Sequence, residues 1–145
     1  MSIHVLKFQD SFRDELINLW ERSVRATHHF LTSEDIAFFK SLVGTIDFNS
    51  FDVYCAFDDE NKMAGMLGVA DGKLEMLFLA PEKIGKGVGK QVMTFALNEL
   101  DVNQVDVNEQ NTNAIEFYAK FGFKVYGRTD RDDHDKPYPI LKMRL

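Results

Sequence analysis

The chain of 145 residues contains little cysteine, little proline and no long apolar run. A single cysteine, Cys55, excludes an internal disulfide framework and a multi-cysteine zinc site. Because it lies within an apolar stretch, we expect it to be a small buried residue rather than a nucleophile. No apolar stretch approaches the roughly 20 residues that a membrane-spanning helix needs, and no cationic segment leads into an apolar one at the N-terminus. We therefore expect a cytoplasmic protein without a membrane partner.

Positive charge is also scarce, since 17 Lys and Arg face 23 Asp and Glu and give a net charge of −6. This balance argues against non-specific binding of nucleic acid. The histidines His28, His29 and His134 lack the spacing of metal ligands, so we expect no metal site. There is no repeat and no linker rich in Gly, Pro or Ser. The length is that of one domain, which we expect to span residues 1–145.

Hydrophobic periodicity predicts an alternation of strands and helices. Asp71-Gly72, between two apolar runs, predicts a tight hairpin, and the strand pair around the helix after Pro81 must be parallel. The expected fold is α/β: a mixed, mostly antiparallel sheet with a central parallel pair and helices on both faces. The expected elements, in order, are strand 3–8, a helix from 10 or 11, a helix from 32 or 33 to 44, strands 51–57, 63–70 and 74–80, helix 88–100, strand 104–108, a helix from 111 or 112 to 121, and strands 123–128 and 138–145.

A glycine-rich loop lies between a central strand and a helix. It reads Ile84-Gly85-Lys86-Gly87-Val88-Gly89-Lys90, and its alternating glycines free successive backbone N–H groups at a helix N-terminus, which is typical of a phosphate or pyrophosphate site. A Walker A loop is excluded because Gln91 follows Lys90 and Ile84 stands where its first glycine must be, and the dinucleotide pattern G-x-G-x-x-G fails as well. A ligand-free glycine turn remains the plain structural alternative.

A second motif follows the next strand, in the stretch Asn108-Glu109-Gln110-Asn111-Thr112-Asn113-Ala114, with Phe117-Tyr118 and Phe121-Gly122-Phe123 behind it. Together with Leu77-Phe78-Leu79-Ala80-Pro81 and the glycine loop, this motif closely resembles the GNAT superfamily of N-acetyltransferases. The resemblance covers residues 74–123, and the segments 22–31 and 136–139 resemble one bacterial subgroup of that family. It implies a GNAT fold whose central parallel strands splay apart.

The resemblance implies direct transfer of an acetyl group from acetyl-CoA to a primary amine. It assigns the pyrophosphate to the loop residues Ile84, Gly85, Lys86, Gly87, Val88, Gly89 and Lys90, and the pantetheine arm to the strand at Phe78 and Leu79. A backbone N–H near Leu79 would polarise the thioester carbonyl. Asn111 matches the position that contacts the cofactor arm, and Tyr118 matches the position whose hydroxyl faces the sulfur. The family usually has Gln or Arg where this chain has Ile84, and we expect Lys83 beside it to supply polarity.

The acceptor site is less defined by the sequence. Glu75 is the best candidate for a base or ammonium-binding group, because it is the only acidic residue of the central strand and shares a face with Leu77 and Leu79; burial there would raise its pKa. The alternative interpretation is that Glu75 lies in solvent, just after the hairpin, and has no role in the site. His28 is the second candidate, and Tyr138 can point into the same site.

The run of charges at residues 130–135 predicts a solvated hairpin loop, or else the lip of a cation-binding acceptor site. Two other functions remain open at this point, a CoA-binding module without catalysis and a nucleotide-phosphate binder. The sequence does not choose the amine acceptor, nor between a monomer and a homodimer.

Overall fold

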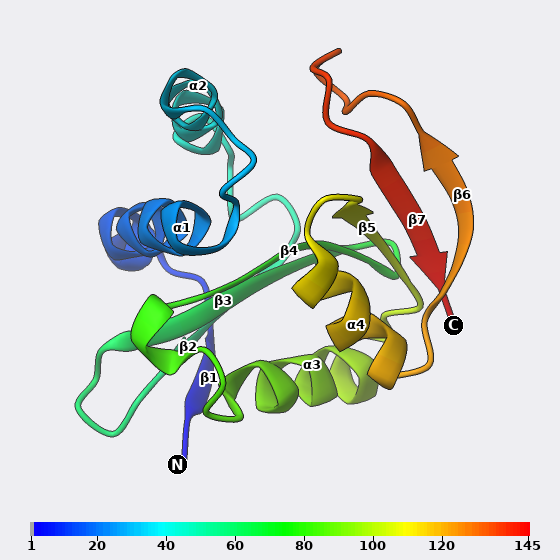
Figure 1. The fold of residues 1–145 in the computed structure, drawn as a ribbon. Helices are drawn as coiled ribbons and strands as arrows, with labels where there is room; N and C mark the ends of the chain where they lie inside the picture. The colour runs from blue at the N-terminus through cyan, green and yellow to red at the C-terminus, as the bar shows by residue number, and fades with distance from the viewer. Residues whose placement is uncertain (1) are drawn as a thin grey trace.

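A computed structural model describes residues 2–145 and contains one seven-stranded sheet, in the order β1-β2-β3-β4-β5-β7-β6 (Figure 1). Four α-helices and two short 3-10 turns accompany it. The elements in chain order are β1 (His4–Lys7), η1 (Asp10–Phe12), α1 (Arg13–Thr27), α2 (Ser33–Val43), β2 (Asp52–Phe57), β3 (Met63–Ala70), β4 (Lys73–Leu79), η2 (Pro81–Lys83), α3 (Val88–Glu99), β5 (Gln104–Asn108), α4 (Thr112–Lys120), β6 (Lys124–Thr129) and β7 (Ile140–Arg144).

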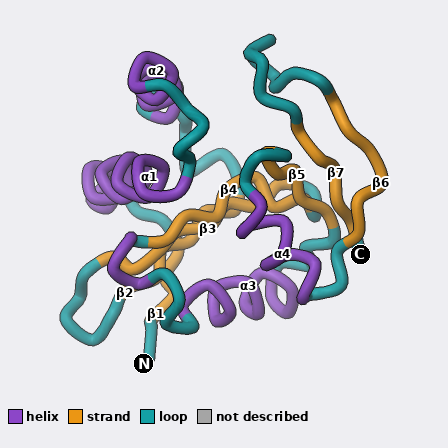
Figure 2. Tube along the Cα trace, viewed as in Figure 1, coloured by secondary structure: helices purple, strands orange, loops and turns teal. Residues whose placement is uncertain are grey.

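The sheet separates two apolar cores, each covered by its own pair of helices (Figures 1 and 2). α1 and α2 lie over one face, where Leu16, Leu19 and Phe48 are almost completely buried. α3 and α4 lie over the other, where Val92 and Met93 are fully buried. This arrangement confirms the expected mixed sheet with helices on both faces.

Local turn chemistry explains most of the boundaries. Asp71 and Gly72 have φ of 49° and 77°, as the tight hairpin between β3 and β4 requires. The Thr32 hydroxyl accepts a hydrogen bond from the Asp35 amide and caps α2. α4 ends before Gly122, whose φ of 98° favours glycine.

Two predicted boundaries are wrong by a few residues. α1 begins at Arg13, because residues 10–12 form the 3-10 turn η1 instead. β7 begins at Ile140 rather than at Tyr138, since the prolines on either side of Tyr138 have no N–H to donate to a neighbouring strand. Tyr138 therefore belongs to the loop between β6 and β7, and the charged run 130–135 is part of that same loop, as expected.

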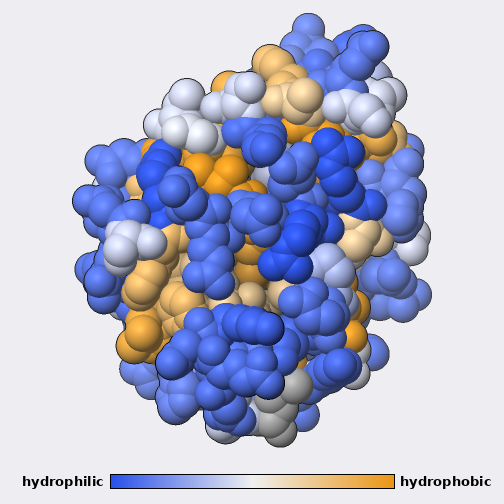
Figure 3. All heavy atoms as spheres, turned by 90° about the vertical axis from the view of Figure 1, so that its left-hand side faces the viewer, coloured by the Kyte–Doolittle hydropathy of each residue, from blue (hydrophilic) through white to orange (hydrophobic). Residues whose placement is uncertain are grey.

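The outer face that α1 and α2 present is mostly hydrophilic, with apolar surface in patches between the polar side chains (Figure 3). Within residues 2–145, no helix is both long and apolar enough to cross a bilayer.

Candidate active site

The centre of the site is the gap between β4 and β5, which are the only strands that pair in parallel within residues 2–145. β4 and β5 pair at Lys73 with Gln104 and at Leu74 with Val105, and no further along. Beyond this point β5 pairs with β7 alone, so the two strands diverge as the resemblance implied. A cavity of about 210 Å³, the splay cavity, lies between them and reaches His28 and Tyr118.

The edge of β4 that borders the splay cavity offers unpaired backbone groups. Ala80 donates its N–H to the Ala64 carbonyl of β3 at 2.9 Å. Hydrogen bonding alternates along an antiparallel pair, so Phe78 also bonds toward β3, whereas the amides and carbonyls of Leu77 and Leu79 point to the other side. An extended ligand can pair with these groups as an added strand.

The glycine loop begins α3 with its backbone amides uncapped. Gly85 and Gly87 have φ of 79° and 85°, a left-handed conformation that favours glycine. Gly87 is the N-cap residue and no side chain caps the helix, so the first amides of α3 have no intrahelical acceptor. A helix N-terminus with exposed amides attracts anions. The loop thus has the geometry of a pyrophosphate site.

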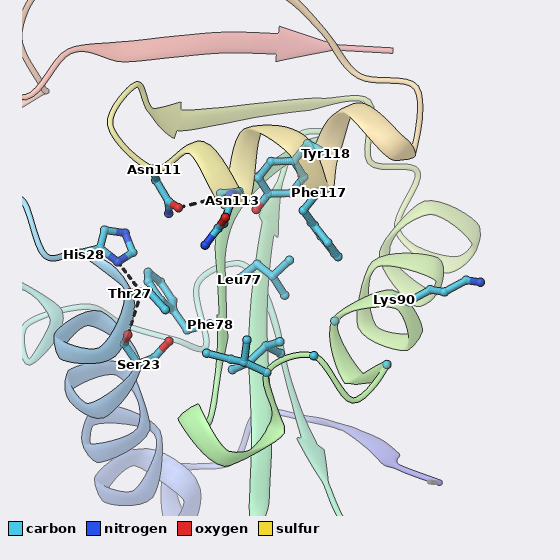
Figure 4. Close-up of a pocket in the computed structure, with 16 residues that line it drawn as sticks. Ser23, Thr27, His28, Leu77, Phe78, Lys90, Asn111, Asn113, Phe117 and Tyr118 are labelled. Carbon is cyan, nitrogen blue, oxygen red and sulfur yellow. Dashed lines mark hydrogen bonds between the residues drawn. The ribbon is translucent and has the colours of Figure 1, made fainter.

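A cavity of about 430 Å³, the loop cavity, joins this helix start to the splay. It is lined by residues of α1, β4, the loop, α3 and α4 (Figure 4). Of the loop residues expected to bind the cofactor, the cavity is bordered by Ile84, Gly85, Gly87, Gly89 and Lys90.

The remaining loop residues take other places. The Val88 side chain is buried in the core, and the Lys86 amide donates to the Lys83 carbonyl at 3.3 Å. The Lys83 ammonium is 3.1 Å from the Asp58 carboxylate, so the expectation that it replaces the missing polarity at Ile84 is wrong. The Lys90 side chain extends away from the cavity in Figure 4. Backbone amides, not side-chain charges, therefore dominate the loop.

Gly89 is required for a different reason, which is close packing. A Cβ atom there would lie 3.2 Å from Leu79 and 3.4 Å from the Phe117 ring. The absence of a side chain lets α3 approach β4 and α4, which fixes the distance between the helix start and the splay.

α4 contributes three polar side chains to the loop cavity (Figure 4). Asn111 uses its side-chain oxygen to accept from the Ala114 amide at 3.2 Å, which leaves its amide nitrogen for a ligand. Asn113 is exposed and borders the same cavity. Tyr118 is 7% exposed, and burial alone raises the pKa of its hydroxyl. It is therefore held in its protonated form beside the splay.

A third cavity, of about 420 Å³, lies on the α1 and α2 side of β4 and is called the polar cavity here. It shares His28 and Phe78 with the loop cavity, so the two meet at those residues. Its acidic lining residues outnumber its basic ones by four to two; they are Glu75, Asp106, Asp132 and Asp133 against Lys73 and Lys142. Lys73 and Asp106 form an ion pair of 2.7 Å, so the excess charge is negative.

Glu75 enters this cavity because of a β-bulge. The register between β3 and β4 passes from Gly68 opposite Met76 to Val69 opposite Leu74, which leaves Glu75 as the extra residue. A bulge re-aims a side chain. Glu75 borders the polar cavity together with Phe78 and the splay cavity together with Leu77, so the expectation that it shares the face of Leu77 and Leu79 is met only in part. It is also exposed rather than buried.

His28, which follows α1, borders the loop, splay and polar cavities. Its Nδ1 atom lies 2.7 Å from the Thr27 hydroxyl. Burial, and to a smaller extent the charge of His29, lowers the pKa of His28 to about 4. The imidazole is therefore neutral near pH 7, where it can exchange hydrogen bonds but is a weak base.

Tyr138 lines the polar cavity, but its hydroxyl is bonded to another residue rather than free for a ligand. Its hydroxyl donates a hydrogen bond to the Asp35 carboxylate of α2, and Lys136 forms an ion pair with the same carboxylate at 2.9 Å. Lys136 and Tyr138 together hold the pKa of Asp35 below its ordinary value. The β6–β7 loop is thereby fastened to α2 above the cavity.

Sequence reasoning did not single out several lining residues. Asn113 and Phe117 stood within the second motif without an assigned role, and nothing in the sequence pointed to a site role for Trp20 or Phe39, whose neighbours in the cavity come from distant segments. Asp133 belongs to the charged run that the sequence offered as the lip of an acceptor site, and it does line the polar cavity. No group of three or more His, Cys, Asp or Glu side chains in residues 2–145 is arranged to hold a metal ion.

Comparison with known proteins agrees with this geometry. A family model described as an acetyltransferase (GNAT) domain matches residues 25–143. The peptidyl-lysine N-acetyltransferase YjaB of Salmonella typhimurium is 37% identical over 99% of this chain and 98% of its own length. The protein of the same name from Escherichia coli is 34% identical over 99% of this chain and 97% of its own length.

Solved structures give the same result. The solution structure of apo YjaB from Escherichia coli matches with a TM-score of 0.90, covering 99% of this chain and 97% of that one. A coenzyme A complex of PaiA N-acetyltransferase from Thermoplasma acidophilum, at 23% identity, matches with a TM-score of 0.72 over the whole of both chains and shows the shared fold. The chain belongs to the GNAT family of acetyltransferases and is an N-acetyltransferase that uses acetyl-CoA.

Proposed function

We propose that this enzyme acetylates the ε-amino group of lysine in a protein or peptide. The observation that carries the proposal is the junction at His28 and Phe78, where the loop cavity meets a polar cavity with excess negative charge. A cationic side chain is attracted into such a cavity. The names of the two YjaB relatives support a lysine acceptor.

In this proposal the backbone of the glycine loop binds the pyrophosphate of acetyl-CoA. Amides at the start of α3 provide the hydrogen bonds, and Ile84 covers the ligand without a charge of its own. The pantetheine arm pairs with Leu77 and Leu79 along the free edge of β4, where the Leu79 N–H donates to the thioester carbonyl. Asn111 offers its amide nitrogen to the same arm.

Transfer is direct, from thioester to amine, without an acetylated enzyme. The neutral amine nitrogen attacks the carbonyl carbon, a C–N bond forms and the C–S bond breaks. The proton that the new amide nitrogen gives up passes to the departing thiolate, so that N-acetyl product and CoA thiol are released. The single cysteine, Cys55, is fully buried, and burial raises the pKa of its thiol to about 12. It is not available as a nucleophile.

The proton of the acceptor ammonium must be removed before attack, because a lysine amine has a pKa of roughly 10.4. We assign this to Glu75, whose carboxylate is the charge that the bulge presents to both the polar and the splay cavities. Glu75 binds the ammonium and takes its proton. His28 orients the acceptor as a neutral hydrogen-bonding group, because burial lowers its pKa to about 4 and leaves the imidazole without a charge near pH 7 that could attract or repel the ammonium.

Tyr118 serves the leaving group. Its hydroxyl, kept protonated by burial, donates a hydrogen bond to the sulfur as negative charge develops there. A thiolate has a pKa of roughly 8.5 and leaves without full protonation, so this contribution is modest. Tyr138 has no contact with the reacting atoms in this scheme and shapes the acceptor cavity through Asp35.

The wider setting is proposed on the sequence evidence. Residues 1–145 form one acetyltransferase domain that works in the cytoplasm, as a monomer or a homodimer, with no nucleic-acid or membrane partner.

The test is a competition between three amines. Purified protein and acetyl-CoA are incubated with a lysine peptide whose N-terminus is blocked, a lysine-free peptide with a free N-terminus, and spermidine, and products are followed by mass spectrometry. Acetylation of the blocked lysine peptide is expected, and its rate should fall in Glu75→Gln. Exclusive acetylation of the α-amine or of spermidine would overturn the lysine assignment.

A further inference from the structure

A fourth cavity, of about 710 Å³, adjoins the polar cavity, and the proposed function assigns no ligand to it. We call it the apolar cavity. It lies between α2, the loop from α2 to β2, and the hairpin ends of β3 and β4. Most of its lining side chains are aliphatic or aromatic and come from Leu42, Val43, Ile46, Phe51, Ala70 and Met76.

The floor of this cavity depends on a glycine. A Cβ atom at Gly68 would lie 2.8 Å from the Phe51 ring, so glycine here lets the ring approach β3 this closely without shifting. Gly68 also stands beside the bulge that turns Glu75. One short stretch of the β3–β4 pair therefore forms the apolar cavity and sets the direction of Glu75.

The apolar and polar cavities are continuous. They share Trp20, Phe39, Glu75, Phe78 and His134, and Glu75 is the only carboxylate among the described residues that line the apolar cavity. Glu75 thus marks the boundary between a space that suits a cation and a space that suits an apolar group.

We propose that the apolar cavity binds the apolar side chain of a residue next to the acceptor lysine, so that the enzyme selects lysines flanked by Leu, Ile, Met or Phe. The inference rests on the proposed function. A lysine reaches the thioester with its ammonium on a four-carbon stem. Glu75 holds the ammonium, so the backbone of the lysine lies the length of this stem away, toward Phe39 and His134, which line both cavities, and the neighbouring side chain meets the apolar cavity there.

Charge complementarity favours this occupant over an acidic neighbour. An Asp or Glu beside the acceptor lysine would face the carboxylate of Glu75 and would lose its hydration against Leu42 and Ile46. A Leu or Phe side chain instead removes apolar surface from water on both sides.

The experiment measures kcat/KM for blocked peptides that differ only in the residue beside a single lysine: Leu, Phe, Ser or Asp. We expect Leu and Phe peptides to exceed the Ser peptide by roughly ten-fold or more, which is the range for burying one such side chain, and the Asp peptide to be the poorest. The difference should lie mainly in KM.

Two variants test the cavity itself. Ala70→Phe fills it from the end of β3, and Thr45→Trp fills it from the exposed loop after α2. Each should reduce the Leu-to-Ser ratio toward one while the Kd for acetyl-CoA remains that of the wild type, which also verifies folding. Ala119→Phe places the same ring on the exposed face of α4 and should keep the wild-type ratio.

Equal kcat/KM for all four peptides, or a ratio unchanged in both filled variants, would overturn the inference while the lysine assignment stands. A different result would also overturn the inference: small amines with an apolar tail are acetylated, Ala70→Phe slows their acetylation, and the residue beside the lysine has no effect in peptides. Failure of every lysine peptide would instead reject the proposed function.

Discussion

The two halves of the site are built by different means. The cofactor half, from β4 through α3 to α4, is made of backbone: free strand edges, left-handed glycines and uncapped helix amides. The acceptor half, between α1, α2 and the β6–β7 loop, is made of side chains from segments far apart in the sequence. Tyr138 and Asp35, which close it, are 103 residues apart.

From this difference we expect the two halves to tolerate substitutions differently. Backbone geometry is encoded by a few local residue types, so a single glycine determines whether the cofactor half forms. The acceptor side chains can be exchanged without altering the sheet, which lets one scaffold accept different amines. A change in one half should therefore affect the step which that half serves and leave the other step intact.

The largest effect is expected from Gly87→Glu. The substitution puts a side chain on a residue with φ of 85° and a carboxylate at the pyrophosphate site, although a Cβ atom itself meets nothing within 4 Å. Like-charge contact costs several kcal/mol, so the Kd for acetyl-CoA should rise about 100-fold or more. Calorimetric titration measures it.

Gly127→Glu is the matched control, because Gly127 lies on β6 with ordinary space around its Cβ position. It should bind acetyl-CoA like the wild type. A Gly87→Glu protein that keeps the wild-type affinity for acetyl-CoA would show that the glycine loop is a turn that binds no ligand. The cofactor half would then not be built on the backbone of this loop.

Glu75→Gln tests the acceptor half. It keeps the shape of the bulge residue but removes the negative charge and the proton acceptor, so kcat/KM for a lysine peptide should fall about 100-fold, a common loss for a general base. The Kd for acetyl-CoA should not change.

Glu116→Gln, at an exposed position of α4, serves as the control and should leave the rate intact. If Glu75→Gln acts like this control, Glu75 is a solvated residue after the hairpin and the polar cavity attracts lysine through its other carboxylates.

The local structure of the cofactor half was largely predictable from the sequence, because its determinants are local, while the binding roles of its residues came from the family resemblance and stay predictions. The glycines fix the loop, Asn111 caps the next helix, and the order of strands around α3 requires a parallel pair. The order and spacing of these residues along the chain are enough to place them, without knowledge of tertiary contacts.

The acceptor half was predicted only in part. The bulge at Glu75 shifts the register between β3 and β4 by one residue, and no residue type in β4 predicts such a shift. The pairing of Lys83 with Asp58 joins two turns that the sequence separates by 25 residues, so the charge that Lys83 was expected to offer to the cofactor is used elsewhere. Tertiary packing decides both.

His28 lies where the halves meet, and its neutrality can be tested through stability. Its pKa is about 4 in the folded protein and near 6.5 when unfolded, so the unfolded state binds the extra proton between these values. The free energy of unfolding should therefore decrease as the pH falls from about 6.5 through about 4, by up to about 3 kcal/mol from this residue.

Urea unfolding of wild type and His28→Gln between pH 4 and pH 7 measures the difference, since other titrating groups are common to both proteins. The wild type should lose more stability on acidification than the variant. Parallel curves would mean that folding leaves the pKa of His28 unchanged, and burial would then not be what keeps the imidazole neutral.

The smallest effect is expected from Tyr118→Phe, which removes one hydroxyl beside the splay and keeps the buried ring. One hydrogen bond to a leaving group that departs fairly well unaided should change kcat by about ten-fold. The KM for acetyl-CoA should be little altered, because backbone groups hold the cofactor. Tyr126→Phe, on the exposed part of β6, is the control. A wild-type kcat in Tyr118→Phe would mean that the Tyr118 ring only packs and that its hydroxyl does not assist the leaving thiolate. The cofactor half would then act through its backbone alone, and the contrast with the side chains of the acceptor half would be sharper still.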